Sequence, residues 1–505
     1  MSPFIQWLLD MTAGAPLPFV AAVVLQPLAD SPLTIRNAYF SPLSKIPGPW
    51  YARLTGARLA WSVFRSNRIH YVHSLHQRYG PVVLIGPSEI DVSDPYAARD
   101  IHRMGSKFTK APFYALLSPG PVDNIFNFRD AKLHMQRRKL YARGFTLGGL
   151  RKEWEPTVRR IVQIAVDKIK QDARTNTAEV MGWWTLMANE IVCRLTFGGG
   201  HDTVEVGVKD PFVLMLERRM GDAAHLLKHF APPLFYIGRL LAKVIPRLHD
   251  VFYSQEKMFA AGGDVVINAR SKKANGETTN LFVKALAEAE QSEEKLATLS
   301  DTDIITDAGA LLLAGSDPAA ISLTFLLYCV LSRPKLQKEL EEACGAIEGE
   351  VTDEACEQIP LLNAVIDESL RLYGAAPGCM PRSVPSEGAV LAGHYIPPQA
   401  IVNTQNWTLH RDPSIWPNPE EFDHTRWLWG LSQAQSLAFS PFGHGSRQCL
   451  GLYLGRMEMR LATAMFFRDC AGAKLAASAT AESMEVYDSF IAGLPRDRRL
   501  EITMK

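Results

Sequence analysis

The sequence predicts a mainly α-helical fold with a small β region. Apolar residues recur three or four positions apart through most of the chain, which is the spacing of amphipathic helices. One short stretch near residue 85 shows instead the pattern of a β-hairpin. The chain has 505 residues, of which 47% are hydrophobic. It is therefore long enough to wrap many helices round a core that encloses a cofactor.

The predicted elements follow one another along the chain. Residues 69–79 have helical spacing, and residues 82–85 and 90–92 are two apolar strands joined by a Gly86-Pro87 turn. Longer helical patterns then cover residues 131–145, 154–170, 183–195, 212–227 and 252–270.

The predicted domain organisation is a membrane anchor, residues 1–42, followed by one large domain, residues 43–505. Residues 11–28 carry no charge and come close to the length of a transmembrane helix, which needs about twenty apolar residues. Several prolines weaken this helix. Positive residues follow the uncharged run and none precedes it, so the large domain would face the cytosol. The alternative is a frayed, partly buried N-terminal segment.

Charge and cysteine content exclude some classes of protein. The formal net charge is +1, whereas a nucleic-acid-binding protein needs clustered Lys and Arg to neutralise phosphates. We therefore expect no nucleic-acid partner. The seven cysteines show no C-x-x-C spacing, which argues against a disulfide scaffold or a zinc site and favours a reducing compartment.

Residues 300–332 predict a long helix that crosses the interior. Ser300 is a typical N-cap with Asp303 three residues later, and the helix that follows is apolar nearly all round. In its middle, Gly315 would let the backbone lie close to a flat ligand. Asp317 is a carboxylate where burial is costly, so it is either paired for structure or kept for proton transfer.

A shorter predicted helix, residues 364–373, carries Glu368 and Arg371 on one face, where they can form a bidentate pair. Such pairs are common and contribute little when they are exposed. Because the helix is apolar around this pair, we expect it to be buried.

The most informative motif is the decapeptide 442–451, FGHGSRQCLG. It places Cys449 between Arg447 and Gly451 in a loop whose glycines let backbone amides approach a flat ligand and point at sulfur. We expect Cys449 to open a helix over residues 450–467, whose N-terminus would favour the thiolate. The decapeptide thus predicts a metal-binding thiolate. The alternative, a buried cysteine in a glycine-rich turn, describes most single cysteines.

The pattern F-x-x-G-x-R-x-C-x-G resembles the haem-binding loop of the cytochrome P450 family, the haem-thiolate monooxygenases, and looks most like its fungal microsomal branch. The resemblance implies the cytochrome P450 fold, with a long central helix over the haem and the thiolate loop on its proximal side. It also implies haem b as cofactor, with Cys449 as the axial ligand of the iron and Phe442, Gly443 and Gly451 among the residues that bind the haem.

The resemblance further offers cations for the two haem propionates, since burying two negative charges requires positive charges nearby. These are Arg447, Arg382 and Arg138, and His134 stands where the family often has a Trp that donates a hydrogen bond. For residues 137–139 the alternative is a solvated basic face that docks a reductase. The Glu368 and Arg371 pair resembles the family's E-x-x-R helix, and Arg426 would be its third member.

The segment Ala314-Gly315-Ser316-Asp317-Pro318 resembles the family's oxygen-activation segment, A-G-x-D-T. The resemblance implies that Ala314 binds the cofactor and that Gly315, Ser316 and Asp317 are catalytic. Pro318 stands where the family usually has a Thr whose hydroxyl helps to deliver protons during oxygen activation. The departure leaves the fold prediction intact and opens the question of how protons are delivered.

The activity that the resemblance implies is oxidation of a hydrophobic small molecule in secondary metabolism by dioxygen. Electrons would come from NADPH through a separate flavoprotein reductase, and the protein would sit on the endoplasmic reticulum membrane with its catalytic domain in the cytosol. Because Pro318 replaces the usual Thr, a haem-thiolate isomerase or dehydratase that needs no external electrons is an alternative. A haem carrier or sensor is a third possibility.

Overall fold

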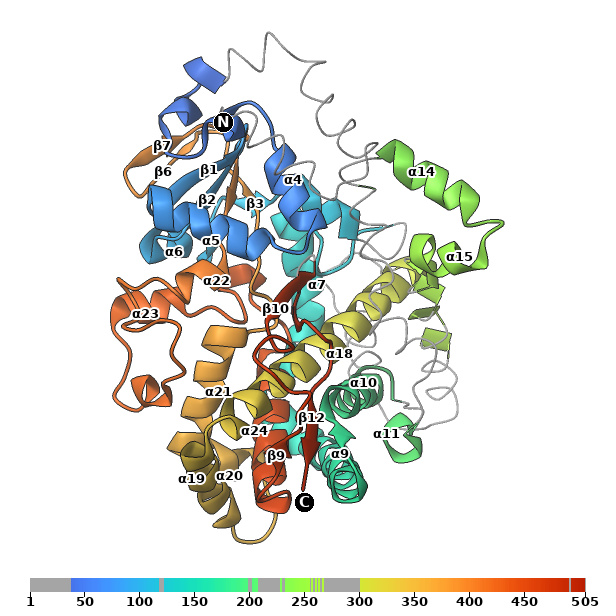
Figure 1. Cartoon of the computed structure of the whole chain (residues 1–505). Helices are drawn as coiled ribbons and strands as arrows, with labels where there is room; N and C mark the ends of the chain where they lie inside the picture. The colour runs from blue at the N-terminus through green and yellow to red at the C-terminus, as the bar shows by residue number, and fades with distance from the viewer. Residues whose placement is uncertain are drawn as a thin grey trace.

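A computed structural model provides the structure of the chain (Figure 1), and it describes residues 38–117, 122–198, 202–207, 228, 232–254, 256–257, 259–260, 262–263, 266–267, 300–489 and 492–504. Helices dominate the structure; strands β1, β2, β6 and β7 lie together at the upper left of Figure 1, and β9, β10 and β12 lie over the middle of the view. The mainly helical prediction with a small β region is confirmed. The predicted anchor lies almost entirely outside the described residues.

The long helix α18 (Asp301–Leu331) runs diagonally through the middle of the molecule (Figure 1). Its start is the predicted cap: the Ser300 hydroxyl accepts a hydrogen bond from the Asp303 N–H at 3.1 Å, and the Asp303 carboxylate accepts one from the Ser300 N–H at 3.0 Å. In the described part of the chain, α18 is the one helix with the length and mean hydropathy, 1.6, of a membrane span. Because 56% of the apolar window is buried inside the protein, it is a core helix.

Three helices pack directly on α18: α10 (Val180–Phe197), α21 (Pro360–Tyr373) and α24 (Leu452–Asp469). A further helix, α9 (Glu155–Thr175), packs on α10 and α24. Each turns one apolar face to a shared core, as their spacing of apolar residues requires. Large buried members of this core are Trp184, Leu195, Phe325, Leu326, Met465 and Phe466.

The predicted hairpin is the start of a five-stranded sheet. Strands β1 (Val82–Gly86) and β2 (Glu89–Val92) pair antiparallel. The sheet has the order β1-β2-β8-β5-β3, in which β2 and β8 are parallel. The other strands of this sheet are β8 (Ile401–Asn403), β5 (Arg382–Ser383) and β3 (Thr109–Lys110).

Three smaller sheets complete the β region: β4-β12-β9, β6-β7 and the hairpin β10-β11. Their strands are β4 (Ala178–Glu179), β6 (Ala389–Leu391), β7 (His394–Ile396), β9 (Lys474–Leu475), β10 (Val486–Ser489), β11 (Ala492–Pro495) and β12 (Glu501–Thr503).

The early helix predictions are confirmed as α5 (Arg68–Tyr79), α7 (Ala131–Ala142) with a 3-10 turn after it (Arg143–Phe145), α9 and α10. The prediction for residues 212–227 lies outside the described residues. The described positions of 252–270 are helical apart from Tyr253, as predicted. The remaining α-helices of the described parts are α4 (Ala57–Phe64), α6 (Pro95–His102), α8 (Leu147–Glu153), α11 (Thr203–Val206), α14 (Pro232–Leu241), α15 (Pro246–Phe252), α19 (Pro334–Gly345), α20 (Asp353–Glu357), α22 (Asn406–Leu409) and α23 (Gln433–Ala438).

The predicted pair on α21 is fully buried and bidentate. Arg371 donates from Nε to Glu368 Oε2 at 2.9 Å and from Nη2 to Glu368 Oε1 at 2.8 Å. Arg426 lies 3.4 Å from the same carboxylate, and the Trp427 indole N–H donates to it at 3.0 Å. The predicted set of Glu368, Arg371 and Arg426 is therefore present, and we call these three residues the lock. Breaking such a buried pair by removing one partner typically costs about 3–5 kcal/mol.

The lock extends from α21 toward the segment that carries Cys449. Arg371 Nη1 also donates to the His410 carbonyl at 2.6 Å, and the His410 Nε2 accepts from the Ser440 N–H at 3.1 Å. Because Nε2 is an acceptor, Nδ1 carries the proton and donates to the Arg371 carbonyl at 2.9 Å. Burial and the neighbouring Arg371 lower the pKa of His410 to about 3, so this histidine stays neutral.

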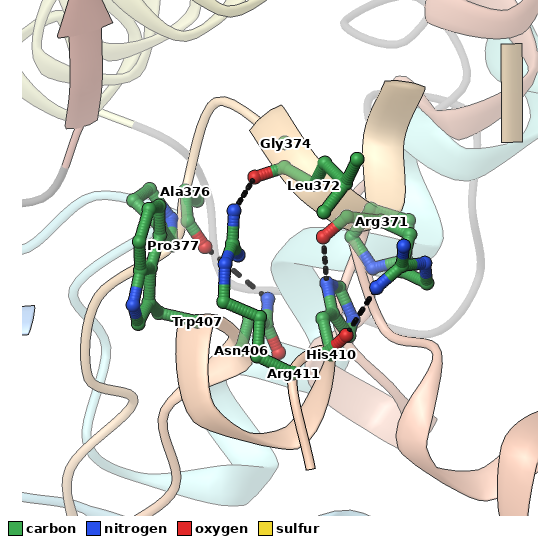
Figure 2. A pocket seen from close by; sticks show the side chains of 10 residues that line it. Arg371, Leu372, Gly374, Ala376, Pro377, Asn406, Trp407, His410 and Arg411 are labelled. Carbon is green, nitrogen blue, oxygen red and sulfur yellow. Dashed lines mark hydrogen bonds between the residues drawn. The ribbon is translucent and has the colours of Figure 1, made fainter. Parts of the chain in front are cut away.

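Figure 2 shows these reciprocal bonds beside a small cavity of about 10 Å³ between the end of α21 and α22. On its other side Arg411 donates to the Leu372 carbonyl at 2.6 Å, and Asn406 donates to the Ala376 carbonyl at 3.2 Å. The carbonyls that α21 and the chain after it leave unpaired are thus satisfied by side chains from α22 and its end. This network holds the framework on which the decapeptide loop rests.

Candidate functional site

The decapeptide loop folds back on itself so that its two ends meet. The Cys449 N–H donates to the Phe442 carbonyl at 2.9 Å, and the Gly443 N–H donates to the Ser440 carbonyl at 2.9 Å. A 3-10 turn, η7 (Gly445–Arg447), occupies the middle of the loop. The loop therefore presents Cys449 beside its own first residue, and it begins directly after the serine that His410 holds.

Two glycines of the loop have conformations that other residues rarely adopt. Gly443 has φ +67° and Gly445 has φ +64°. A Cβ on Gly445 would also collide with the carbonyl oxygen of His102 at the end of α6. Gly451 differs, since its φ is −86° and no atom lies near the place of a Cβ. The predicted close approach of backbone is therefore present at Gly445, where the backbone of α6 lies against the loop.

The prediction that Cys449 opens the following helix is wrong by two residues. Helix α24 begins at Leu452 with Gly451 as its N-cap, so Cys449 lies in the loop before it. The Gly451 N–H hydrogen-bonds the Cys449 sulfur and lowers its pKa, but burial is the larger cause, and the pKa of Cys449 is raised overall. A bound metal ion would deprotonate the thiol outright, so the thiolate depends on the metal more than on the helix.

Cys449 nevertheless has accessible surface, unlike five of the other cysteines, which are buried. Burial still raises the pKa of its thiol, so protein atoms surround the sulfur closely. Arg138 of α7 donates to the carbonyl of Gln448, next to Cys449, at 2.7 Å. Leu450, on the other side, packs against the buried cluster that includes Leu312 of α18. The sulfur is thus held between α7 and the central helix.

The residues predicted to bind propionates come together with two that the sequence did not single out. Arg382, buried on β5, donates to the Tyr114 hydroxyl at 3.2 Å. Lys110, buried on β3, lies 4.1 Å from the centre of the Tyr114 ring. Lys110 and Arg382 are direct partners in the β3-β5 pairing. That strand pairing, which no local sequence pattern indicates, is what brings Lys110 to the site.

The positive charges of this cluster repel one another. Burial and the neighbouring Arg382 lower the pKa of Arg447 to about 10. Burial, followed by Arg382 and Arg447, lowers the pKa of Lys110 well below its ordinary value. Burial and the same neighbours, Arg447 first, lower the pKa of His134 to about 3. Within the described part of the chain, the buried Nη1 of Arg447 has no hydrogen-bond partner. A group with two carboxylates fits this arrangement, because it would supply the missing acceptor and relieve the repulsion.

We call the four basic residues Lys110, Arg138, Arg382 and Arg447, together with the neutral His134 that lies among them, the cation cradle. Together with the accessible Cys449 sulfur, the cradle matches the donor set that a haem requires: one thiolate for the iron and several cations for two propionates. The residues present therefore fit the cofactor that the sequence indicates.

In the middle of α18, some residues are exposed on one side of the helix and others are buried on the opposite side. Ala314 and Pro318 are exposed although the helix crosses the interior, so this side of α18 borders open space. Ser316 is buried; its hydroxyl donates to the Leu312 carbonyl at 2.8 Å and accepts from Asn189 of α10 at 3.2 Å. Asp317 is half-buried.

Gly315 serves a purpose other than the one predicted. A Cβ at this position would collide with the Val192 side chain of α10, so the missing side chain allows α10 to pack closely on α18. The expected approach of the Gly315 backbone to a flat ligand is therefore corrected to a helix-helix contact. The small residue that faces the open side is Ala314.

The alternative reading of residues 137–139 as a docking face is not supported for Arg137. Its side chain is buried and donates to Asp303 and Asp307 of α18. Arg138 is half-buried against the decapeptide loop, and only Lys139 of the three is exposed.

The sequence also matches a known protein family. The cytochrome P450 family model matches residues 47–474, from before α4 to β9. The chain belongs to the cytochrome P450 family. Its relatives include the cytochrome P450 monooxygenases stcB of Emericella nidulans, 69% identical over 94% of this chain and 91% of that protein, and cypX of Dothistroma septosporum, 65% identical over 99% of each. A third is aflV of Aspergillus parasiticus, 66% identical over 93% of each.

The chain is accordingly a cytochrome P450 monooxygenase, and the haem-thiolate iron centre of the family is its cofactor. Cytochrome P450 monooxygenases use dioxygen and a redox partner that supplies electrons. The predictions of family, fold class and enzyme type are confirmed.

Lys110 offers a test of the cation cradle. Replacing it by methionine, Lys110→Met, removes a buried cation, so the haem-free protein should be as stable as the wild type or more stable. Haem should be lost about tenfold faster, because a charge-assisted contact to a propionate is missing. The measurement is haem transfer to excess apomyoglobin, followed in the Soret band.

The control is Lys107→Met, because Lys107 is exposed and pairs only with Glu387 at the surface. It should lose haem at the wild-type rate. An unchanged rate of haem loss in Lys110→Met would remove Lys110 from the cradle.

Proposed function

We propose that Cys449 binds haem b as the axial ligand of its iron, and that the protein oxidises a hydrophobic phenolic metabolite of fungal secondary metabolism there. The observation that carries the proposal is that Cys449 keeps accessible surface although burial raises the pKa of its thiol. Two residues before it, the buried Nη1 of Arg447 has no hydrogen-bond partner among the described residues. The further residues proposed to bind haem are Phe442, Gly443, Gly451, Ala314, Lys110, His134, Arg138, Arg382 and Arg447.

The phenolic substrate class is supported by a more distant relative. The methylphloroacetophenone oxidase of Cladonia uncialis is 34% identical over 77% of this chain and 86% of that protein. Its name denotes an acylated phenolic ring as substrate. Ala314 is exposed on the central helix, and its small side chain would leave room for a planar phenolic ring beside the helix.

Haem bound through a thiolate supplies the iron that activates dioxygen with two electrons and inserts one oxygen atom into the substrate. The chain contributes the environment of that reaction. The Gly451 N–H hydrogen-bonds the sulfur and stabilises its negative charge. The arginines of the cradle would hold the carboxylates of the haem through charge-assisted hydrogen bonds. His134 is neutral and offers an N–H donor without adding a further charge.

The alternative of an electron-independent isomerase or dehydratase has less support. Two classes of name occur among the relatives described above, monooxygenase and oxidase, and both denote oxidation. The observation that favoured the alternative was Pro318, which changes one donor in α18 and leaves the thiolate loop and the cradle intact. Monooxygenation with external electrons is therefore the function that we propose at this site.

Cys449→Ser tests the ligand assignment. A serine hydroxyl does not supply a thiolate, so the reduced variant with carbon monoxide should lack the red-shifted absorption band of a thiolate-bound haem. Cys379→Ser serves as the control, since Cys379 lies outside the decapeptide loop, and should keep that band. A normal thiolate-type band in Cys449→Ser would show that another residue is the ligand.

We also propose that Asp317 delivers protons in place of the family's usual Thr. Pro318 has no N–H, so the Ala314 carbonyl oxygen lacks the partner that an ordinary helix residue would provide. That carbonyl lies on the side of α18 that borders open space. It can accept a hydrogen bond from a water molecule, and the half-buried Asp317 carboxyl, one position before Pro318, can pass a proton to that water.

Asp317→Asn tests this proton path. The amide does not take up and release a proton, so product formation per NADPH consumed should fall about tenfold or more, and the missing electrons should appear as hydrogen peroxide. Asp301→Asn, at the exposed first turn of the same helix, is the control and should keep wild-type coupling. If Asp317→Asn also retains wild-type turnover and coupling, Asp317 does not deliver protons.

We infer further that the electrons come from NADPH through a flavoprotein reductase, and that residues 1–42 anchor the protein on the endoplasmic reticulum. The uncharged run 11–28 and the positive residues after it support a cytosolic domain. A flavoprotein is a suitable redox partner because it can take two electrons from NADPH and pass them on one at a time.

The anchor is tested by carbonate extraction of membranes from cells that express the protein. The full chain should remain in the membrane pellet, whereas a chain that begins at Ser44 should be extracted and still give the carbon monoxide band. Complete release of the full chain into the supernatant would exclude a spanning helix.

A further inference from the structure

A buried carboxylate of α18 that the proposed reaction does not use joins three elements. Asp307 is fully buried. Its Oδ1 accepts a hydrogen bond from the backbone N–H of Ile125 at 2.8 Å. Its Oδ2 accepts from the Tyr141 hydroxyl at 2.8 Å and from the Arg137 guanidinium. Asp307 therefore ties the central helix both to α7 and to the loop that precedes α7.

The charge of Asp307 is balanced inside this cluster. Arg137 Nη2 also donates to Asp303 Oδ1 at 2.9 Å, and the guanidinium lies 5.4 Å from the centre of the Phe128 ring. Burial by itself would lower the pKa of Arg137, but Asp307 raises it above its ordinary value. The arginine therefore stays charged beside the carboxylate. A buried ion pair with several further hydrogen bonds is held in one geometry.

The loop that Asp307 holds, residues 123–128, is built as a unit. Asn124 Oδ1 accepts from the Phe126 N–H at 2.8 Å and from the Asn127 N–H at 3.0 Å. Asn127 Oδ1 accepts in return from the Asn124 N–H at 2.6 Å. Both asparagines are buried. These reciprocal bonds fix the shape of the loop, so a displacement at Ile125 moves the loop as a whole.

The same loop is attached to the cation cradle at its next residue. The Phe126 carbonyl accepts a hydrogen bond from Lys110, whose Nζ also lies 4.1 Å from the centre of the Phe126 ring. The Phe126 ring meets Tyr114 edge to face, with their centres 5.6 Å apart. Ile125 instead packs in the buried cluster that contains Leu312 of α18. The loop thus spans the distance between the cradle and the central helix.

We propose that Asp307 is a positioning residue for the substrate cavity. By holding the Ile125 N–H, it fixes loop 123–128 as the wall between the cation cradle and α18, and this wall determines which molecules fit next to the haem. The proposal rests on the proposed haem-dependent function, because the loop bounds a substrate cavity only when haem occupies the cradle. It assigns Asp307 to selectivity and leaves the reaction chemistry to the residues described above.

Two nitrogen ligands of haem iron that differ in size test the proposal. Imidazole is small and need not reach the loop. The phenyl ring of 4-phenylimidazole extends further, and its binding depends on contact with the loop in its wild-type position. In Asp307→Asn, a single amide oxygen replaces the two carboxylate oxygens that serve three donors. The dissociation constant of 4-phenylimidazole, measured from the shift of the Soret band, should rise about tenfold. That of imidazole should change by less than about twofold.

Tyr141→Phe is the matched control. It removes one donor to Asp307 and leaves the Ile125 contact, so both dissociation constants should stay within about twofold of the wild type. Asn124→Ala disrupts the loop from within without touching Asp307 and should reproduce the selective loss of 4-phenylimidazole. This second variant decides the question if Asp307→Asn does not accumulate with haem.

Three results separate the possibilities. Selective weakening of 4-phenylimidazole in Asp307→Asn or Asn124→Ala supports the proposal. Wild-type affinity for both ligands, with full haem content, overturns it while leaving the proposed function intact. A wild-type protein that shows no thiolate-type carbon monoxide band refutes the proposed function itself, and the loop proposal with it.

Discussion

The buried pair of Glu368 and Arg371 is the interaction on which the placement of the thiolate depends. Arg371 reaches past its partner to the carbonyl of His410, whose ring accepts from the backbone of Ser440. Ser440 begins the turn into the loop, and the loop closes on itself through the N–H of Cys449. A short series of buried hydrogen bonds therefore runs from α21 to the sulfur. If one group in this series moved, the next group would lose its hydrogen-bond partner. The positions of these groups therefore depend on one another.

The cation cradle differs from the lock in how its buried charges are balanced. Around Glu368 the buried charges are matched, whereas the cation cradle gathers charges of one sign and leaves a nitrogen of Arg447 without a partner. Repulsion of this kind makes the empty site less stable than its surroundings. An anionic cofactor that binds the folded chain and not the unfolded chain removes the repulsion and adds its own binding free energy to folding. The cradle is therefore completed by its ligand, while the lock is complete without it.

Much of this site is visible in the sequence because its parts are local. The loop motif, the capped central helix and the spacing of Glu368 and Arg371 each lie within one segment, where helix and turn chemistry act directly. Lys110 and Asp307 were missed because their partners come from distant segments: Lys110 reaches the cradle through the pairing of β3 with β5, and Asp307 meets the N–H of Ile125. Gly315 was misread for the same reason. Its neighbour, Val192, is on another helix, and one sequence alone does not reveal which helices touch.

The composition of α18 has a consequence for how the chain is made. Its apolar stretch would satisfy the criteria by which a ribosome-bound translocon selects membrane helices. An aspartate at the centre of such a segment opposes insertion by about 2.5–3.5 kcal/mol, and α18 carries Asp317 at its centre and Asp307 nearer its start. Each of these two carboxylates therefore adds a cost to insertion of the segment into lipid. The acidic groups that organise the finished site thus also favour an aqueous surrounding for the newly made helix.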